Sequence, residues 1–458
     1  MIIPRMDTNM SIASLLFVTL GCAKNEVDTD KMRARLLREG FEECFDPQDA
    51  DACIVNTCAF LTSATSESIE TILELAELKN ERSGTQPIIV CGCVPSRYGN
   101  DLMTELPEVA AFVPVEDEQH IVEIVRDALG MGERIRSMSS DIMRTIEGAS
   151  AYVKISDGCD RFCTFCAIPY IRGRYASRPA GELIEEVRAL MSGGVREIVL
   201  IGQDTGVWGS DLGDDSNLAG LLRSVAEVVR PYGGWIRVLY LQPEGMTDEL
   251  IRVMRDIPEV LPYIDIPIQH CCPSILHRMG REGSRETLAA LFDHLREEIP
   301  GMVLRTTGLV GFPGETEAEF EELLDFVAEQ EFDYVSVFGY SREEGTRAAE
   351  FADQLDESTI LDRTQRLLDV TEQMGFAATA SHVGETVEVI IDGIEESESG
   401  MELIGHAWFQ APDCDGAVHI EAGEASVGDI VTCKLVDSFC YELVGEPVDA
   451  YKGEGTLS

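Results

Sequence analysis

Six cysteines of this 458-residue chain stand at spacings that suit iron or zinc, and three of them lie in one short stretch. Cys159, Cys163 and Cys166 have C-x3-C-x2-C spacing. Because thiolates in one short loop can converge on a small object, this spacing suits three irons of a cubane cluster, and it leaves the fourth iron for a substrate or cofactor. Zinc is the alternative, but zinc would want a fourth nearby Cys or His, and residues 167–216 contain neither.

The other three candidate ligands, Cys22, Cys58 and Cys93, are far apart in the sequence. Each follows an apolar run that predicts a β-strand, and loops at one edge of a parallel sheet converge, so the three thiols can meet at one site. A single buried cysteine more commonly packs as a small hydrophobe, and Cys91 is a rival ligand to Cys93. The remaining cysteines match no ligand pattern and are predicted to be structural: Cys44, Cys53, Cys91, Cys271, Cys272, Cys414, Cys433 and Cys440.

Three regions of different pattern must position these residues. Residues 14–144 alternate apolar strands with amphipathic helices, which predicts an α/β domain with a parallel sheet. Residues 145–378 repeat six β/α units, which predicts a partial barrel related to the (β/α)₈ plan, with chemistry at the C-terminal ends of the strands. Residues 383–448 carry short β-like runs, which predicts a small five-stranded antiparallel barrel of the oligonucleotide-binding size class.

The apolar patterns of the first two regions predict individual strands and helices. In the first region the strands are 15–20, 52–57 and 87–92, and the helices are 26–39 and 66–79. In the second region the strands are 152–156, 197–202, 235–241, 263–268, 302–312 and 332–338, and the helices are 181–192, 217–230, 247–257, 284–298 and 315–330.

The composition, 45% hydrophobic and 26% charged, is typical of a globular protein. The apolar run 12–22 ends in Gly21-Cys22 like a lipoprotein cleavage site, but it is too short to span a bilayer and is better explained as the first buried strand. Fourteen cysteines without a secretory signal favour a reducing compartment, where thiols bind metals before they form disulfides. We therefore expect a cytoplasmic protein with no membrane partner.

The loop around Cys159 resembles the signature of the radical S-adenosylmethionine (SAM) superfamily, and Phe165 is the aromatic residue expected before the last cysteine. Together with the three amino-terminal cysteines, this loop resembles the methylthiotransferase family, and the resemblance extends along nearly the whole chain. The blocks that carry this similarity are CAIPYIRGRYASRP (166–179), IGQDTGVWG (201–209), IDIPIQHCCPSILHRMGR (264–281), RTTGLVGFPGETEAEF (305–320) and GYSREEGTRA (339–348).

The resemblance implies three cofactors: SAM and two 4Fe–4S clusters. One cluster would be held by Cys159, Cys163 and Cys166, and its open iron would bind SAM. The other, an auxiliary cluster, would be held by the three amino-terminal cysteines, with Cys93 preferred to Cys91 because Cys93 stands in the family pattern Gly-Cys-x3-Arg-Tyr.

Three polar residues are candidate SAM contacts because they lie at or near predicted strand ends. They are Gln203, Gln269 and Arg305, and the guanidinium of Arg305 could pair with a carboxylate. The alternative is that these side chains brace loops at the surface. No acid–base dyad is expected, because C–H cleavage by a radical does not need one.

The net charge of −47, from 83 acidic and 36 basic residues, argues against a general nucleic-acid binder. The charge is unevenly distributed. Residues 383–458 carry 17 acidic and 2 basic residues, against 25 and 13 in residues 1–144 and 41 and 21 in residues 145–382. The last region therefore has more than twice the charge density of either other part. A salt-adapted organism, whose proteins are acidic in general, would explain the net negative charge of residues 1–382. It explains less well the higher charge density of residues 383–458.

The resemblance covers two branches of the family that act on different substrates, so the charge of this chain helps to choose between them. MiaB-type enzymes modify an adenosine in tRNA, whereas RimO-type enzymes modify an aspartate on the twelfth protein of the small ribosomal subunit. In both branches the carboxy-terminal barrel, a TRAM domain, is thought to recognise the substrate. An acidic barrel would repel tRNA and attract a basic protein. The segment 411–416, APDCDG, also resembles the Ala-Pro-Glu-x-Asp-Gly segment of RimO-type barrels, with Asp in place of Glu.

These observations favour the RimO-type reaction. A 5′-deoxyadenosyl radical would take hydrogen from the β-carbon of the aspartate, sulfur would arrive through the auxiliary cluster, and a second SAM would supply the methyl group. The expected partners are a basic ribosomal protein or the small ribosomal subunit, and an electron donor of the flavodoxin or ferredoxin type. The alternatives are a tRNA adenosine methylthiotransferase and a non-catalytic iron–sulfur or zinc protein that binds the ribosome.

Overall fold

The computed structural model describes residues 13–81, 86–132, 144–145, 148–397, 400–421 and 425–448. The chain forms two compact units: unit 1 comprises residues 1–145 and 167–173, and unit 2 comprises residues 146–166 and 174–458. Residues 133–143, which belong to the first predicted domain, lie outside the described residues. A short segment that follows Cys166 in the sequence thus belongs to the amino-terminal unit.

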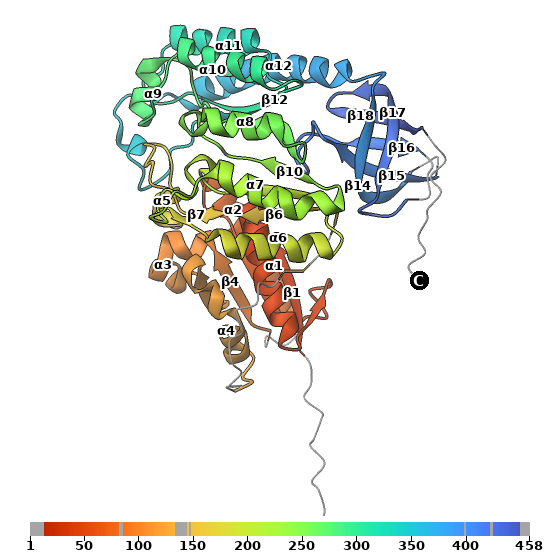
Figure 1. Cartoon of the computed structure of the whole chain (residues 1–458). Helices are drawn as coiled ribbons and strands as arrows, with labels where there is room; N and C mark the ends of the chain where they lie inside the picture. Colours follow the sequence, from red (N-terminus) through yellow and green to blue (C-terminus); the bar gives the residue numbers. More distant parts are fainter. Residues whose placement is uncertain are drawn as a thin grey trace, which may run out of the picture. The chain divides into compact units, whose positions relative to one another are not determined.

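Unit 1, drawn mostly in red and orange in Figure 1, is built on a parallel five-stranded sheet with the order β2-β1-β3-β4-β5. Every residue of β3 and β4 is buried, which explains why these two strands are continuous apolar runs in the sequence. The strands are β1 Ser14–Thr19, β2 Glu42–Cys44, β3 Ala52–Thr57, β4 Ile88–Gly92 and β5 Val109–Pro114. The α-helices are α1 Ala23–Arg38, α2 Thr62–Glu81, α3 Cys93–Glu105, α4 Ile121–Ala128 and the short α5 Ile168–Ile171.

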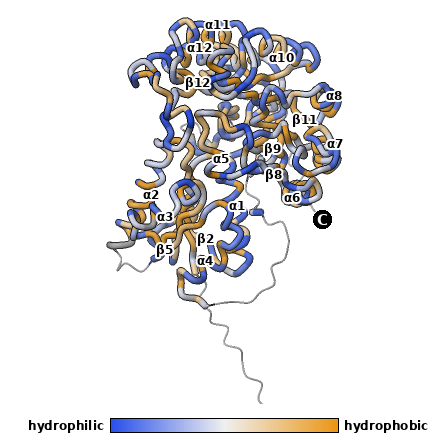
Figure 2. Tube along the Cα trace, turned by 90° about the vertical axis from the view of Figure 1, so that its left-hand side faces the viewer, coloured by the Kyte–Doolittle hydropathy of each residue, from blue (hydrophilic) through white to orange (hydrophobic). Residues whose placement is uncertain are grey.

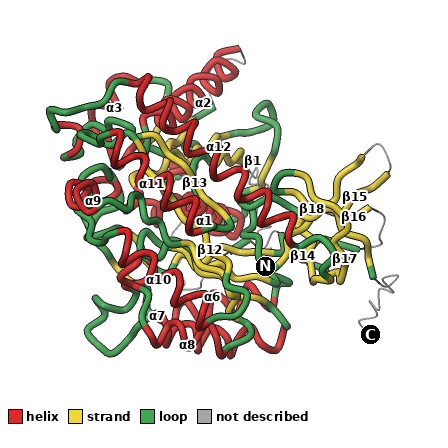
Figure 3. Tube along the Cα trace, turned by 90° about the horizontal axis from the view of Figure 1, so that it is seen from above, coloured by secondary structure: helices red, strands yellow, loops and turns green. Residues whose placement is uncertain are grey.

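Unit 2 begins with a parallel six-stranded sheet whose order, β13-β12-β11-β10-β9-β6, confirms the predicted (β/α)₆ arrangement. Helices (red in Figure 3) lie around the outside of these strands (yellow). The strands are β6 Ser150–Lys154, β9 Glu197–Ile201, β10 Trp235–Val238, β11 Val260–Asp265, β12 Val303–Val310 and β13 Tyr334–Gly339. The helices are α6 Ala180–Ser192, α7 Leu218–Val229, α8 Asp248–Asp256, α9 Pro273–Met279, α10 Arg285–Glu298 and α11 Glu317–Gln330. A two-stranded hairpin, β7 Ser156–Asp157 and β8 Ala176–Ser177, follows β6.

The carboxy-terminal part of unit 2 is a closed five-stranded barrel with the order β14-β15-β16-β18-β17, as predicted, but it is not wholly antiparallel, because β16 and β18 pair in parallel. Its strands are β14 Thr386–Ser397, β15 Gly400–Ala407, β16 Val418–Glu421, β17 Ile430–Phe439 and β18 Glu442–Pro447. The helix α12, Glu357–Ser381, precedes it. No helix was predicted over α12, although Asp356 caps its first turn by accepting from the amide of Thr359.

Buried charges join this barrel to the parallel sheet of unit 2. Asp415 accepts from the Tyr263 hydroxyl at 2.5 Å and from Nε of Arg305 at 3.1 Å. His406 contacts Glu197 at 2.6 Å, and Glu197 also pairs with the fully buried Arg237 at 2.7 Å. The segment APDCDG therefore fastens the barrel, and Asp415 is its anchoring residue.

Burial follows the expected apolar patterns. Figure 2 shows hydrophobic and hydrophilic residues alternating along α6, α7 and α8, which suits helices packed on one face of a sheet. Among the described residues, no helix combines the length and the apolar character that crossing a bilayer requires.

Candidate functional site

In unit 2, the three closely spaced cysteines lie on the loop between β7 and β8. Gly158, with φ of 71°, and Phe162, with φ of 48°, turn the backbone so that the short loop folds back on itself. The amide of Cys166 donates to the carbonyl of Cys163 at 3.1 Å, and the amide of Thr164 donates to the carbonyl of Met279 at 2.9 Å. The loop is thus held both by itself and by the turn that ends α9.

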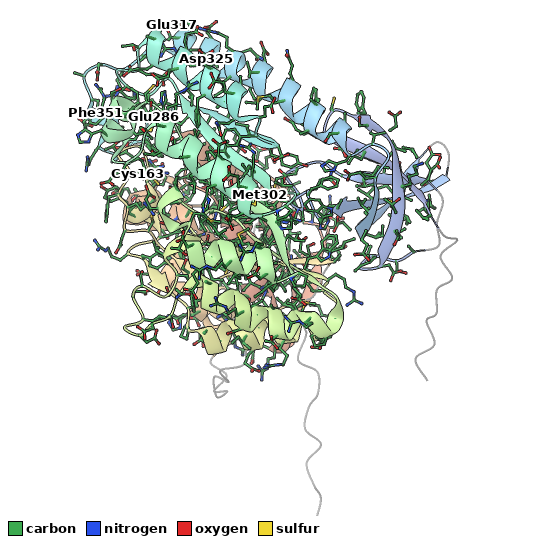
Figure 4. The ribbon with its side chains drawn as sticks, turned by 45° about the horizontal axis from the view of Figure 1, so that its top comes forward. Cys163, Glu286, Met302, Glu317, Asp325 and Phe351 are labelled. Atoms are coloured by element: carbon green, nitrogen blue, oxygen red, sulfur yellow. The ribbon has the colours of Figure 1, made fainter. Side chains whose placement is uncertain are left out.

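The position of this loop matches the predicted location of chemistry. Figure 4 labels Cys163 at the end of the sheet opposite to Met302, the residue that precedes β12. Since β12 runs away from Met302, Cys163 lies at the end where the parallel strands finish, the edge that carries the active sites of β/α barrels.

Charged groups surround the loop. Asp204, buried after β9, pairs with Nε of Arg161 at 2.5 Å, and Glu244 pairs with the same guanidinium at 3.0 Å. Asp157 accepts from the amide of Gly158 at 3.0 Å and from Nε2 of Gln203 at 3.0 Å. These contacts fix the backbone immediately before the first cysteine. Sequence reasoning had named only Gln203 among these groups.

The three predicted SAM contacts have different surroundings. Gln203 lies beside the cysteine loop, and its Oε1 is buried without a hydrogen-bond partner, as expected of a group that faces a ligand. Gln269 has φ of 67° and continues β11 through backbone bonds to Thr307 and Leu309. Arg305 lies near the start of β12, and its guanidinium is engaged by Asp265 at 3.5 Å and by Asp415. These partners indicate that Arg305 fastens the carboxy-terminal barrel, a role different from the predicted contact with SAM.

In unit 1, the other three cysteines each follow a central strand of the sheet. Cys22 is the N-cap of α1, Cys58 follows β3, and Cys93 is the first residue of α3. Two of the thiols thus stand at helix N-termini, where the exposed amides and the helix dipole favour negative charge. Because β1, β3 and β4 are neighbouring parallel strands, the three cysteines that follow them lie at the same edge of the sheet.

Two glycines make this approach possible. Gly21 has φ of 101°, and a Cβ there would meet Cβ of Cys58 at 2.6 Å. Gly92 has φ of 89°, and a Cβ there would collide with Oδ1 of Asn56 and the carbonyl of Thr57. Any side chain at either position would push the loops apart.

Buried polar side chains hold the three loops at this edge, and sequence reasoning missed them. Nδ2 of Asn25 donates to the carbonyl of Leu20 at 2.8 Å and to the carbonyl of Thr57 at 2.9 Å. The Thr57 hydroxyl donates to the carbonyl of Cys91 at 2.6 Å and accepts from the amide of Val94 at 3.3 Å. Asn25 therefore ties the ends of β1 and β3 together, and Thr57 ties β3 to the start of α3. The only sequence signal is the polar residue at each strand end.

Cys91 and Cys93 occupy different environments. Cys91 is a fully buried residue of β4 that packs among apolar side chains such as Leu15, Ile54 and Ile89. Cys93 lies past the end of the strand, near Asn25 and the other two thiols. The geometry favours Cys93 as the ligand and Cys91 as a packing residue.

None of these six cysteines is in a disulfide, and their thiols suit soft metal ions. Burial raises the pKa of the Cys58 and Cys159 thiols, and it raises the pKa of Cys93 to about 12, so a bound cation is needed to hold these sulfurs as thiolates. Among the described residues, the set with three metal-type ligand atoms within 4.8 Å of one another is His270, Cys271 and Cys272, which belongs to neither triad. The wider spacing of both triads fits separate irons of a cluster better than one zinc ion.

The His270 group has a packing role of its own. The thiols of Cys271 and Cys272 donate to the carbonyls of Glu322 and Glu319 on α11, and Nδ1 of His270 accepts from the amide of Cys272. These bonds use the ligand atoms to anchor α9 against α11, as expected for structural cysteines.

Family models cover all three regions of the chain. Residues 14–114 match a model described as uncharacterized protein family UPF0004, residues 153–327 match the radical SAM superfamily, and residues 383–448 match the TRAM domain. Among solved structures, the radical SAM methyltransferase TsrM from Kitasatospora setae, with cobalamin and a [4Fe–4S] cluster bound, has a TM-score of 0.54 at 13% identity. The alignment covers 85% of this chain and 78% of TsrM, and it supports the fold alone.

Curated relatives extend the match to nearly the whole chain. A ribosomal protein uS12 methylthiotransferase RimO from Trichlorobacter lovleyi is 41% identical, over 96% of this chain and 100% of its own length. A second, from Geotalea uraniireducens, is 42% identical over 94% of this chain and 97% of its own length. With two convergent cysteine triads, a parallel (β/α)₆ sheet and a carboxy-terminal TRAM barrel, the chain belongs to the RimO family of radical SAM methylthiotransferases, enzymes that use SAM and [4Fe–4S] clusters.

Proposed function

We propose that this protein methylthiolates the β-carbon of an aspartate residue in ribosomal protein uS12. The observation that carries the proposal is the presence of two separate sets of three convergent thiols on a RimO-family chain. One set suits SAM cleavage and the other suits sulfur transfer, so a single chain has the parts for both halves of the reaction.

We assign Cys159, Cys163 and Cys166 to the cluster that binds SAM, and Cys22, Cys58 and Cys93 to the auxiliary cluster. When bound, the first cluster supplies one electron that breaks a C–S bond of SAM. Gln203 is assigned to SAM binding because its buried Oε1 has no hydrogen-bond partner, and Gln269 because its left-handed backbone follows β11 and pairs with β12 at Gly308. Asp157 accepts a hydrogen bond from Nε2 of Gln203 and so fixes the orientation of the carboxamide group. Oε1 is then left to accept a hydrogen bond from an amine of a ligand.

The carboxy-terminal barrel supports a basic protein as the substrate. Its exposed acidic residues include Glu388, Glu395, Glu396, Glu421, Asp437 and Glu446. Such a surface attracts a basic ribosomal protein and repels the tRNA backbone. We therefore place the protein in the cytoplasm with the ribosome as its partner, and with an electron donor of the flavodoxin or ferredoxin type.

The deciding experiment offers the reconstituted and reduced enzyme SAM together with either small ribosomal subunits or tRNA. We expect a methylthio mass increase on one aspartate of uS12 and none on tRNA. A mass increase on tRNA alone would overturn the substrate assignment. Zinc in place of iron, with no 5′-deoxyadenosine formed, would instead identify a non-catalytic ribosome binder.

The acidic surface can be tested separately. Glu388→Lys combined with Glu396→Lys should lower kcat/KM for the ribosomal substrate at low salt and weaken its salt dependence, because fewer charges steer the encounter. SAM cleavage without substrate should stay at the level of the unmodified enzyme. An unchanged kcat/KM would show that another surface recognises the substrate.

A further inference from the structure

We propose that Arg172 and Asp28 form a buried ion pair that sets the reduction potential of the auxiliary cluster. The proposal rests on the assignment of that cluster to Cys22, Cys58 and Cys93. Neither residue is a ligand, so the pair would act through the charge it places beside the thiols.

The guanidinium of Arg172 is almost entirely removed from solvent. Its side chain is 2% exposed and that of Asp28 is 5% exposed, and NH1 of Arg172 lies 3.0 Å from Oδ2 of Asp28. NH2 of Arg172 donates to Oδ1 of Asn25 at 2.7 Å. Asn25 is the residue that ties the loops of the auxiliary site together, so Arg172 is attached directly to that frame.

Arg172 also faces the thiols. Its charge acts on Cys58 and Cys93, and its guanidinium is within hydrogen-bonding reach of the Cys93 sulfur. Oδ1 of Asn25 contacts the same sulfur at 3.8 Å. The buried guanidinium of Arg172 thus lies near two of the three proposed ligands, and Asp28 on α1 pairs with it.

The sign of the effect follows from electrostatics. Reduction adds one negative charge to a cluster, and a positive charge in a dry environment stabilises the reduced form more than the oxidised form. Arg172 should therefore raise the potential, and Asp28, which partly cancels the guanidinium charge, should lower it. If the pair were purely structural, substitutions of Arg172 and of Asp28 would not shift the reduction potential in opposite directions, because removing either partner would leave the other buried and unpaired.

The experiment uses the full chain with Cys159→Ala, Cys163→Ala and Cys166→Ala, so that only the auxiliary cluster is reconstituted. Potentiometric titration followed by electron paramagnetic resonance then gives the midpoint potential. We expect Arg172→Gln to lower the ratio of reduced to oxidised cluster at least tenfold at a fixed potential, about 59 mV for a one-electron couple. Asp28→Asn should shift it in the opposite direction, and Arg172→Lys should retain most of the unmodified value.

Arg33→Gln is the matched control, because Arg33 lies on the same helix as Asp28, pairs with Glu43 at 3.1 Å and is not among the charges that act on Cys58 and Cys93. Its potential should equal that of the parent. Shifts of the same sign for Arg172→Gln and Asp28→Asn, no shift, or loss of iron from both variants would overturn the tuning role. A parent chain that binds no iron would refute the auxiliary-cluster assignment itself, and with it this inference.

Discussion

The two cysteine sites differ in how the chain assembles them. Cys159, Cys163 and Cys166 come from one loop between two short strands, whereas Cys22, Cys58 and Cys93 come from three loops that only strand pairing brings together. The first site has its three thiols within eight residues of one another, although the end of α9 also holds its loop. The second needs the register of β1, β3 and β4 and the side chains that brace their ends. The difference teaches that one site is a local property of the sequence and the other is a property of a folded sheet.

The largest expected effect separates the chemistry of the two sites. Cys163→Ala should abolish 5′-deoxyadenosine formation, whereas Cys58→Ala should retain it and lose methylthiolation. Each variant should hold about half of the iron of the unmodified enzyme. Iron analysis, nucleoside chromatography and mass spectrometry of the substrate give the three readouts.

Cys440→Ala, at an exposed cysteine of the carboxy-terminal barrel, is the control and should change none of these readouts. If Cys58→Ala lost SAM cleavage as completely as Cys163→Ala, the two sites would not be separable and the comparison would fail.

Thiol reactivity without metal should also differ. In unit 1, Cys22 is exposed, while Cys93 is buried with its pKa raised to about 12, so only about 10⁻⁴ of the Cys93 thiol is ionised at pH 8. Iodoacetamide should label Cys22 at least about 100-fold faster than Cys93 in the metal-free chain. Mass spectrometry of a time course measures both rates, and equal rates would contradict the burial of Cys93.

Removing the Asn25 side chain, which holds the strand ends of unit 1 together, should damage only the amino-terminal cysteine site. Asn25→Leu deletes the bonds to the carbonyls of Leu20 and Thr57, and the lost bonds should lower the free energy of unfolding of unit 1 by about 2–4 kcal/mol. The auxiliary iron should be lost while the iron of the loop site is retained. Denaturant titration and iron analysis test this together.

The matched control is Asn217→Ala in unit 2, which removes the cap of α7. It should cost about 1 kcal/mol and leave both clusters in place. Equal loss of iron from both sites in Asn25→Leu would mean that the loop site also depends on the sheet of unit 1.

The smallest expected effect is a pH dependence confined to unit 2. Burial alone would lower the pKa of His406, but the carboxylates of Glu197 and Asp392 raise it from 6.5 to about 9. The protonated ring therefore contributes stability in full below pH 6.5, and this contribution is lost as the pH rises through 9. Thermal unfolding between pH 6.5 and 9 should show the loss, and His406→Gln should flatten it. A slope unchanged by that substitution would assign the pH dependence to other groups.

The sequence alone predicts the loop site more directly than the amino-terminal cysteine site. The loop site follows from spacing alone, because ligands close in sequence must be close in space. The amino-terminal set could be proposed because each cysteine follows an apolar run, but Asn25 and Arg172 could not, since their partners lie far away along the chain. Arg305 shows the same limit, because its partner Asp415 is 110 residues away and comes from the carboxy-terminal barrel.

The fold was predicted where the patterns were strong. The six strands of unit 2 and its main helices lie close to their expected ranges, and the range of β3 is the one expected. The strands β2 and β5 were not predicted, because β2 is only three residues long and β5 carries little apolar periodicity at the edge of its sheet. β11 spans Val260–Asp265, whereas the prediction was 263–268, because a proline such as Pro262 is uncommon inside a strand and masks its beginning in the sequence.

The membership of residues 167–173 in unit 1 has a consequence for the order of protein synthesis. A ribosome makes the whole sheet of unit 1 and then the loop with Cys159, Cys163 and Cys166 before it reaches Arg172. Until then Asp28 lacks the arginine that pairs with it in the finished structure. Residues 167–173 complete the amino-terminal unit only after residues 146–166 of unit 2 have been made, so all six cysteines proposed as cluster ligands have been synthesised before the first unit is finished.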